Sequence, residues 1–141
     1  MKSLKVATAI IGILLALYLF YDMFKAKKEE RDLLSWINIS VLQIDSSIPP
    51  GLLIEVDNNG PRAIGRTHFR LVFKVGEKVL CRVDTDHGNF LPNEKRQIFL
   101  KALSVNEDAG YPPGTKIRYL LQAFPEYKKG LEIIQGEFLL K

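Results

Sequence analysis

The sequence predicts a small all-β domain, an antiparallel β-sandwich of about seven strands, preceded by one N-terminal transmembrane α-helix. The first observation behind this fold class is a continuous apolar run, Val6–Phe24, with basic residues on both sides. The second is that the rest of the chain alternates between apolar and polar residues. The third is a turn signal rich in Gly, Pro, Asn or Asp roughly every 8–12 residues, a spacing typical of short antiparallel strands.

Residues 1–24 are expected to form the transmembrane helix. As an α-helix, Val6–Phe24 is about 28 Å long at about 1.5 Å per residue, which nearly matches a hydrocarbon core of about 30 Å. The residues expected at the membrane interface are Tyr18, Tyr21, Phe24, Lys25, Lys27 and Lys28. Aromatic rings favour the headgroup level, and lysines reach anionic headgroups from there, so the bilayer is an expected partner.

A cleaved secretory signal also fits a basic start and an apolar run. Residues 18–24 are bulky where a signal peptidase needs small side chains, which favours an uncleaved signal anchor. The basic C-terminal flank favours a cytoplasmic domain, whereas a basic start is typical of exported signal anchors. Our working assignment is a single-pass membrane protein with a periplasmic or extracellular domain, and the orientation stays open. The single cysteine, Cys81, forms no internal disulfide and indicates no compartment.

After the anchor, residues 25–32 are predicted to be a charged juxtamembrane linker that continues the helix for a turn or two. Residues 33–141 are predicted to be one domain, large enough for a real core. Its first strand is Trp36–Val41, in which alternate residues face inward. Its second is Leu52–Val56, which the turn signal at residues 57–61 closes.

The strand Arg66–Val75 has the clearest alternation. Its expected inward residues are Thr67, Phe69, Leu71, Phe73 and Val75. Gly76-Glu77 fits a two-residue type II′ hairpin turn into Lys78–Asp84, since Gly accepts a positive φ.

Three more strands are predicted at Arg96–Leu103, Lys116–Phe124 and Leu131–Leu140, with a bulge at Gly136. Seven short strands favour an immunoglobulin-like sandwich. The chain lacks the Cys…Trp…Cys pattern of antibody domains.

Part of this domain carries turn and strand motifs in a recognisable order. These are Val56-Asp-Asn-Asn-Gly-Pro, the strand Phe69–Phe73, Gly76-Glu77, and Leu91-Pro-Asn-Glu-Lys95. Over about residues 56–103 the pattern resembles the FxLYD and LEA-14-like domains. That resemblance implies a fibronectin-III-like sandwich, often membrane-tethered, with no shared enzymatic activity. The chain departs from the family pattern at residues 73–75, where Tyr-Asp is missing, and at Asn93, which replaces the turn glycine.

Candidate catalytic and metal-binding groups are few. Asp84-Thr-Asp-His87 could hold a cation, but these are also ordinary turn residues, and a calcium loop needs more carboxylates. Cys81 with His87 as its base could form a nucleophilic pair, but a small buried residue is the usual reading of a strand cysteine. We therefore expect no catalytic residue, no cofactor and no small-molecule substrate.

Six of the twenty basic residues flank the predicted anchor. The net charge is +4, yet from Leu33 onward 14 basic residues stand against 12 acidic ones. The domain is nearly neutral, so nucleic acid is not an expected partner.

The interface candidates are Ala9, Gly12, Ala16, Arg66, His68, Arg70, Lys74, Arg82 and Tyr111. The first three give the helix a small-residue face that another helix can approach closely. The next five form a basic stripe on the outer face of one hairpin, where a solvated face is the alternative.

From these features we predict a non-enzymatic accessory subunit that stabilises or assembles a larger membrane protein complex, for example a respiratory or photosynthetic one. The alternative is a membrane-tethered module that binds a lipid, glycan or peptide.

Overall fold

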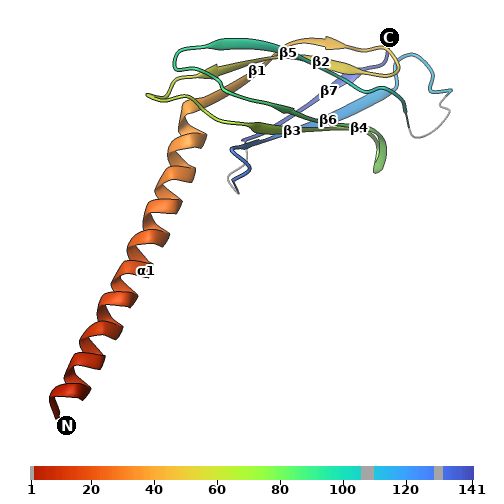
Figure 1. Ribbon diagram of the computed structural model, residues 1–141. Coiled ribbons are helices and arrows are strands. Elements are labelled where there is room, and N and C mark those ends of the chain that lie inside the picture. The colour runs from red at the N-terminus through yellow and green to blue at the C-terminus, as the bar shows by residue number, and fades with distance from the viewer. Residues whose placement is uncertain (1, 106–109, 129–131) are drawn as a thin grey trace.

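A computed structural model of the chain describes residues 2–105, 110–128 and 132–141 (Figure 1). One long helix, α1 (Lys2–Trp36), leads into seven strands. The strands are β1 (Ile37–Asp45), β2 (Gly51–Asn58), β3 (Thr67–Val75), β4 (Lys78–His87), β5 (Lys95–Lys101), β6 (Lys116–Pro125) and β7 (Glu132–Leu139).

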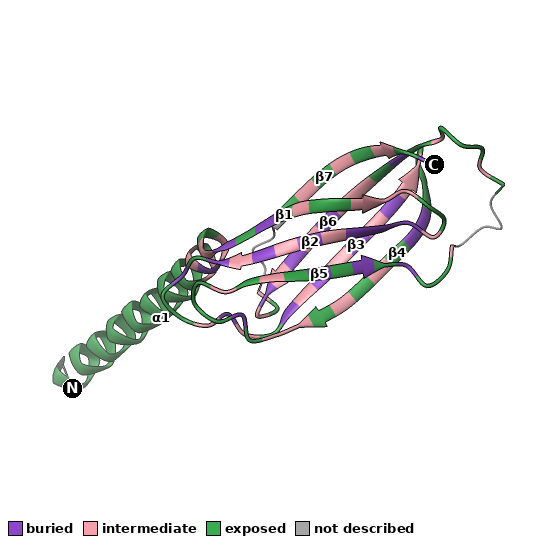
Figure 2. Ribbon diagram, turned by 90° about the horizontal axis from the view of Figure 1, so that it is seen from above, coloured by how far each residue is buried: buried purple, intermediate pink, exposed green. Residues whose placement is uncertain are grey.

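The strands form two antiparallel sheets that pack face to face. One sheet has the order β1-β2-β5 and the other the order β4-β3-β6-β7. Their inner faces form the core, which appears as buried positions between the sheets in Figure 2. The largest fully buried side chains include Phe69, Phe73 and Phe90. The predicted fold class, an all-β sandwich behind one N-terminal helix, is confirmed.

The third strand bears out the predicted alternation most clearly. Thr67, Phe69, Leu71 and Phe73 are buried on β3, and the residues between them are partly exposed. In the following turn Gly76 has a φ of 60°, which supports the predicted glycine turn. On β5, Ile98 and Leu100 face the core, whereas Phe99 is exposed.

Two local predictions are wrong. The strand predicted to end at Asp84 continues, since Thr85–His87, expected in a turn, belong to β4 and pair with Phe69 to Thr67 of β3. Cross-strand pairing keeps the segment extended although its composition is typical of turns. Gly136 marks no bulge, since the β6–β7 register runs through it without a shift. A side chain there would collide with the ring of Tyr119, which explains the glycine.

Helix α1 is long and apolar enough to span a membrane, with its apolar window fully exposed. It continues through the charged residues 25–32 and ends at Trp36, so the first predicted strand begins one residue late, at Ile37. Leu33, in the last helical turn, is only 1% exposed and belongs to the core of the sandwich. The helix therefore passes directly into the sandwich.

The end of the helix is held by the β2–β3 loop. The backbone N–H of Asn59 donates to the carbonyl of Trp36 at 2.8 Å. The Cζ of Arg62 lies 5.4 Å from the centroid of the Trp36 ring, an arrangement typical of a cation–π contact. Gly60 lies so close to the Trp36 ring that no side chain fits between them.

A third segment, the turn after β6, contacts both the loop and the helix. The guanidinium of Arg62 donates to the carboxylate of Glu126 at 2.8 Å and 3.3 Å. Lys128 Nζ lies 3.3 Å from Glu29 Oε2 on the helix. The helix thus descends from one end of the sandwich on the side of the β4-β3-β6-β7 sheet, and the β1-β2-β5 sheet lies on the far side (Figure 1).

Candidate interaction surface

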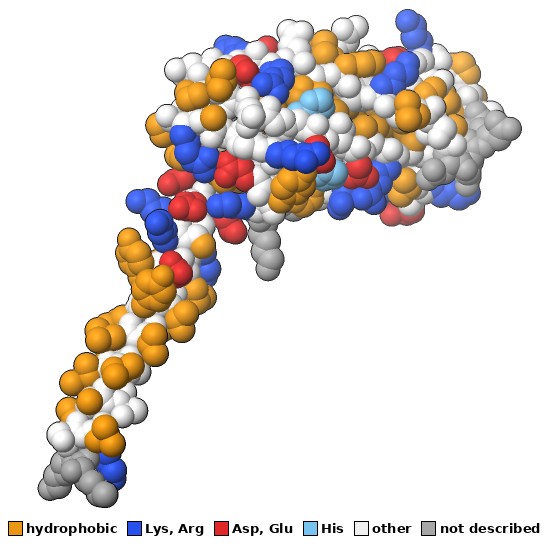
Figure 3. Space-filling model, in the orientation of Figure 1, with side chains coloured by type: hydrophobic (Ala, Val, Ile, Leu, Met, Phe, Trp, Pro, Cys, Tyr) orange, Lys and Arg blue, Asp and Glu red, His pale blue; other side chains and the backbone are white. Residues whose placement is uncertain are grey.

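The outer face of the β4-β3-β6-β7 sheet carries the densest group of interacting polar side chains. We call it the lower face, since it lies on the helix side of the sandwich (Figure 1). Basic, acidic and apolar side chains alternate along this side in Figure 3. The outward residues of β3 on this face are His68, Arg70, Val72 and Lys74. On β4 the first three of them pair with Asp86, Asp84 and Arg82, in that order. On β6 all four pair, in the same order, with Phe124, Gln122, Leu120 and Arg118.

His68 lies at the centre of a charged cluster on this face. Its Nδ1 is 2.7 Å from Asp86 Oδ1, and its Nε2 is 2.9 Å from Asp84 Oδ1. A neutral imidazole has one N–H donor, so only the imidazolium donates to both carboxylates at once. The hydrogen bond to Asp86 is the largest effect on the pKa of His68 and raises it. Burial lowers this pKa, but the hydrogen bond to Asp84 adds to the rise and leaves the pKa above its ordinary value.

Three arginines complete the cluster. Arg70 Nε lies 3.2 Å from Asp84 Oδ1, Arg82 Nε donates to Asp84 Oδ2, and Arg66 Nη2 lies 3.3 Å from Asp86 Oδ2. Partial burial raises the pKa of Asp84, but the hydrogen bonds from Arg82, His68 and Arg70 outweigh it and hold the pKa at about 2. Both aspartates therefore stay ionised near neutral pH, since hydrogen bonding from His68 also lowers the pKa of Asp86.

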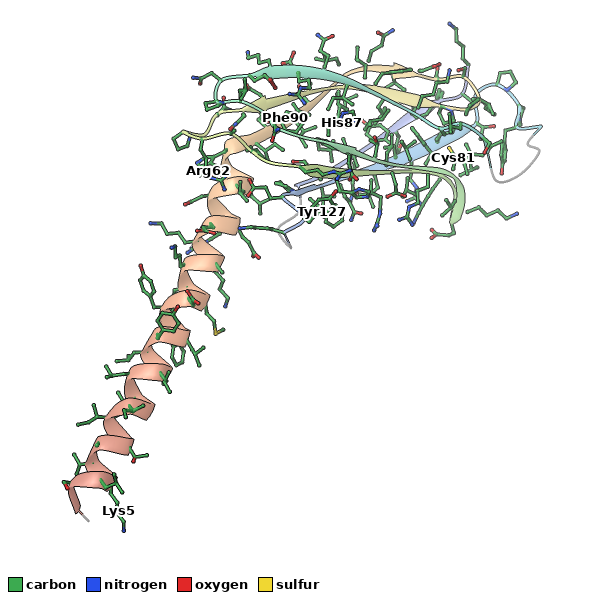
Figure 4. All side chains as sticks on the ribbon, viewed as in Figure 1. Lys5, Arg62, Cys81, His87, Phe90 and Tyr127 are labelled. Atoms are coloured by element: carbon green, nitrogen blue, oxygen red, sulfur yellow. The ribbon has the colours of Figure 1, made fainter. Side chains whose placement is uncertain are left out.

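Aromatic rings flank the histidine. The His68 ring lies 5.8 Å from that of Phe124 and 6.4 Å from that of Tyr127, measured between centroids. The hydroxyl of Tyr127 hydrogen-bonds to Asp86. Tyr127 is 56% exposed and lies on the lower side of the sandwich (Figure 4). The cluster thus presents both charged groups and aromatic rings on the helix side of the sandwich.

A shallow open groove continues the lower face toward β7. Val72, Lys74, Arg118, Leu120, Gln135 and Glu137 are among its lining residues. Arg118 Nη2 donates to the carbonyl of Gly76 at 2.7 Å, which fixes one wall. Lys116 Nζ lies 3.3 Å from Glu137 Oε2 on the other side. The groove lining therefore combines the apolar side chains of Val72 and Leu120 with the basic groups of Lys74 and Arg118 and the carboxylate of Glu137.

The predicted basic stripe lies on this face, but its electrostatics differ from the prediction. Arg66, His68, Arg70 and Arg82 all contact Asp84, the last residue of the predicted strand, or Asp86, which was expected in the turn after it. The aspartates neutralise part of the stripe because the strand continues through them. Lys74 lies farther along β3, opposite Arg118 of β6. The binding role of these residues stays a prediction.

The cluster also contains residues that the sequence analysis missed. Arg82, Asp84 and Asp86 are spaced two residues apart, and in a strand this spacing places side chains on the same face. That spacing is the signal that could have predicted their position. Phe124 and Tyr127 carried no such signal, since their contact with His68 depends on the β3–β6 register and on the turn that follows β6.

The remaining interface candidates lie away from this cluster. Tyr111 precedes β6 and packs, partly buried, against the core. Ala9, Gly12 and Ala16 are exposed on α1, and a side chain added at Gly12 meets nothing within 4 Å. The residues predicted to lie at a membrane interface, Tyr18, Tyr21, Phe24, Lys25, Lys27 and Lys28, are likewise exposed along the helix.

Cys81 and His87 do not form a catalytic pair. They pair with Phe73 and Thr67 at opposite parts of β4, about 20 Å apart at about 3.3 Å per residue. Figure 4 shows Cys81 at the end of the sandwich away from α1, with His87 nearer the helix. Burial raises the pKa of the Cys81 thiol to about 11, so it is not a thiolate near neutral pH. Among the described residues, no group of three or more His, Cys, Asp or Glu side chains could hold a metal ion.

No protein-family model matches this chain, and no curated protein matches it in sequence. The similar solved structures include a crystal structure of Bacteroides uniformis beta-glucuronidase, with a TM-score of 0.48 and 18% identity. Another is B. uniformis beta-glucuronidase 2 covalently bound to cyclophellitol-6-carboxylate aziridine, with the same TM-score of 0.48 and 18% identity. Each match covers 73% of this chain and 12% of the enzyme chain.

Proposed function

We propose that this protein is a non-enzymatic, single-pass membrane accessory subunit that stabilises or assembles a larger membrane protein complex. The observation that carries the proposal is the joint between the exposed apolar helix and the sandwich. Leu33 of the helix is buried in the core, and Trp36 is held by Asn59 and Arg62. A flexible linker would serve for simple tethering, whereas a packed joint holds the sandwich in one direction relative to the membrane.

The helix supplies the membrane part of the proposed interface. Its small residues Ala9, Gly12 and Ala16 lie on one face at spacings of three and four, which lets a second helix approach closely. The membrane anchor itself is part of the proposal, and it holds for either orientation of the helix. Respiratory and photosynthetic complexes are examples of suitable hosts.

The test is recovery of the tagged full-length chain from native membranes in mild detergent. A large complex that co-purifies at fixed stoichiometry is the expected result. Recovery of the anchored chain as a lone monomer would refute the accessory role. Recovery in the soluble fraction would refute the anchor.

Two matched variants test the helix face. Ala16→Leu fills the small-residue face and is expected to lower recovery of the complex, because it blocks close helix approach. Ala7→Leu makes the same change on the opposite face of the helix and is expected to leave recovery unchanged. An equal loss for both variants would show that this face is not the interface.

A second candidate function is a membrane-tethered module that binds a lipid, glycan or peptide. The groove between Lys74, Arg118 and Gln135 favours it, since its lining combines apolar side chains with two basic groups that suit an amphipathic anionic ligand. Thermal unfolding of the full-length chain in detergent, with and without candidate lipids or glycans, tests this function. A saturable rise in melting temperature supports it.

A further inference from the structure

We propose that the lower face of the sandwich docks onto the anionic lipid headgroups of the membrane in which α1 is anchored. This inference rests on the proposed membrane anchor and names what the lower face meets. It requires that this face is turned toward the bilayer, that its charge suits the headgroups, and that the joint holds it within reach.

The direction follows from the joint. The helix leaves the sandwich on the side of the β4-β3-β6-β7 sheet (Figure 1). Trp36 is fixed by Arg62, and Glu29 is paired with Lys128 beyond β6. With the apolar part of α1 in the bilayer, the lower face is turned toward the membrane and the β1-β2-β5 sheet is turned away.

The two outer faces differ in charge. Among the described residues, six cations lie on the lower face, namely Arg66, Arg70, Lys74, Arg82, Lys116 and Arg118. Four carboxylates accompany them, namely Asp84, Asp86, Glu137 and Glu77, whose Oε1 lies 3.7 Å from Arg118 Nη2. The opposite face carries two cations, Lys95 and Lys101, against three carboxylates, Asp45, Glu55 and Asp57. Only the lower face has the excess positive charge that attracts an anionic surface.

The lower face also presents apolar and aromatic side chains. Ile133 and Leu139 of β7 are 50% and 62% exposed, and Val79 of β4 is 42% exposed. Tyr127 adds an aromatic ring with a polar end, which suits the headgroup level. A face of this composition gains both electrostatic and apolar contacts at a lipid surface.

The distance is compatible with contact. About 18 Å of helix separates Phe24 from Trp36, at about 1.5 Å per residue. Headgroups occupy roughly 5–7 Å of that length. The remaining gap is of the order of the Debye length, about 8–10 Å at moderate salt. A helix tilt of about 20° and the long basic side chains reduce the gap further.

The test uses the full-length chain in vesicles of phosphatidylcholine, alone or mixed with phosphatidylserine, that carry a headgroup-attached quencher. A fluorescent label is placed at Gln135→Cys on the lower face or at Gln97→Cys on the opposite face. Both positions are exposed, and the native Cys81 is buried, so labelling is confined to the new cysteine. Resistance of the chain to alkaline extraction first reports on the anchor.

We expect stronger quenching at position 135 than at position 97 in phosphatidylserine vesicles, and a loss of this difference at high salt. Lys74→Gln with Lys116→Gln should lower the docked-to-undocked ratio roughly 30-fold, at about 1 kcal/mol for each lysine removed. Lys95→Gln with Lys101→Gln removes the same charge from the opposite face and should leave that ratio unchanged.

Equal quenching at both positions in an extraction-resistant chain would overturn the docking while leaving the anchor intact. Quenching at position 135 that is insensitive to salt and to the Lys74 and Lys116 substitutions would also overturn it. Absence of quenching at both positions would likewise overturn docking to lipid, and another protein would then be the candidate occupant of this face. Release of the chain by alkaline extraction would instead refute the proposed anchor.

Discussion

Arg62 lies over the ring of Trp36, the last residue of the helix, with its Cζ 5.4 Å from the ring centroid. The same guanidinium donates to the carboxylate of Glu126, whose pKa is lowered chiefly by that hydrogen bond. One side chain therefore connects the helix, the β2–β3 loop and the turn after β6. This connection helps to set the direction of the helix. Gly60→Ala and Leu33→Ala test the packing between the helix end and the sandwich.

Gly60→Ala is expected to destabilise the protein. A Cβ at this position would collide with the Cβ and the indole ring of Trp36, which the joint holds in place. Overpacking of this kind costs about 1–3 kcal/mol. The free energy of unfolding, measured with denaturant in detergent, checks the prediction.

The matched control for Gly60 is Gly110→Ala, since a Cβ at Gly110 meets nothing within 4 Å. It should change the free energy of unfolding little. Comparable losses for both variants would show that Trp36 does not pack against Gly60.

Leu33→Ala tests whether the last helical turn belongs to the core. Leu33 is 1% exposed, so its truncation should lower the free energy of unfolding by about 2–5 kcal/mol. Its neighbour Leu34 is only partly buried, and Leu34→Ala should cost clearly less. The comparison uses chemical denaturation of both variants under one set of conditions. Equal, small losses would mean that the sandwich folds independently of the helix end.

Sequence pattern predicted most of the fold because strands and turns are each indicated by residues that are close together in the chain. Alternation along Thr67–Val75 placed its buried residues correctly, and Gly76 supplied the positive φ of the following turn. The end of the helix was less predictable, since no glycine or proline separates Trp36 from β1. Contacts of Trp36 with Asn59, Gly60 and Arg62, which follow it by more than 20 residues, hold the end of the helix.

The candidate surface was predicted only in part. Outward-facing Arg66, His68 and Arg70 followed from alternation, whereas the neighbours of His68 depend on strand register. Asp84 and Asp86 have the composition of a turn, and pairing with β3 overrides it. Tyr127 reaches the cluster through a turn in which Glu126 and Tyr127 have φ values of 52° and 57°. Such a conformation is rare for these residues, so sequence pattern does not predict it.

His68 predicts a specific pH dependence of stability. Its pKa in the folded protein is raised above its ordinary value, chiefly by the hydrogen bond to Asp86. The stabilisation is therefore fully present below about pH 6.5 and is lost as the pH rises through the folded-state pKa. His68→Gln should remove that loss. Denaturant unfolding at several pH values from about 5 to about 9 checks the prediction.

His87→Gln is the control for this titration. Burial lowers the pKa of His87, so its contribution to stability has the opposite sign and is lost as the pH falls. Its substitution should leave the alkaline loss of stability in place. A wild-type profile that stays flat above neutrality would contradict the doubly hydrogen-bonded imidazolium.

Gly136 and Tyr119 face each other across β6 and β7, and we expect their substitutions to be strongly coupled. A Cβ at Gly136 would collide with the Tyr119 ring, which also packs 6.4 Å from the ring of Phe138. Gly136→Ala alone should therefore cost about 1–3 kcal/mol. In a Tyr119→Ala background the collision is absent, so the same change should be neutral or stabilising, because glycine is unfavourable within a strand. A double-mutant cycle in the free energy of unfolding measures the coupling, for which we expect about 1–2 kcal/mol. Additive effects would show that space for Tyr119 is not the reason for glycine at this position.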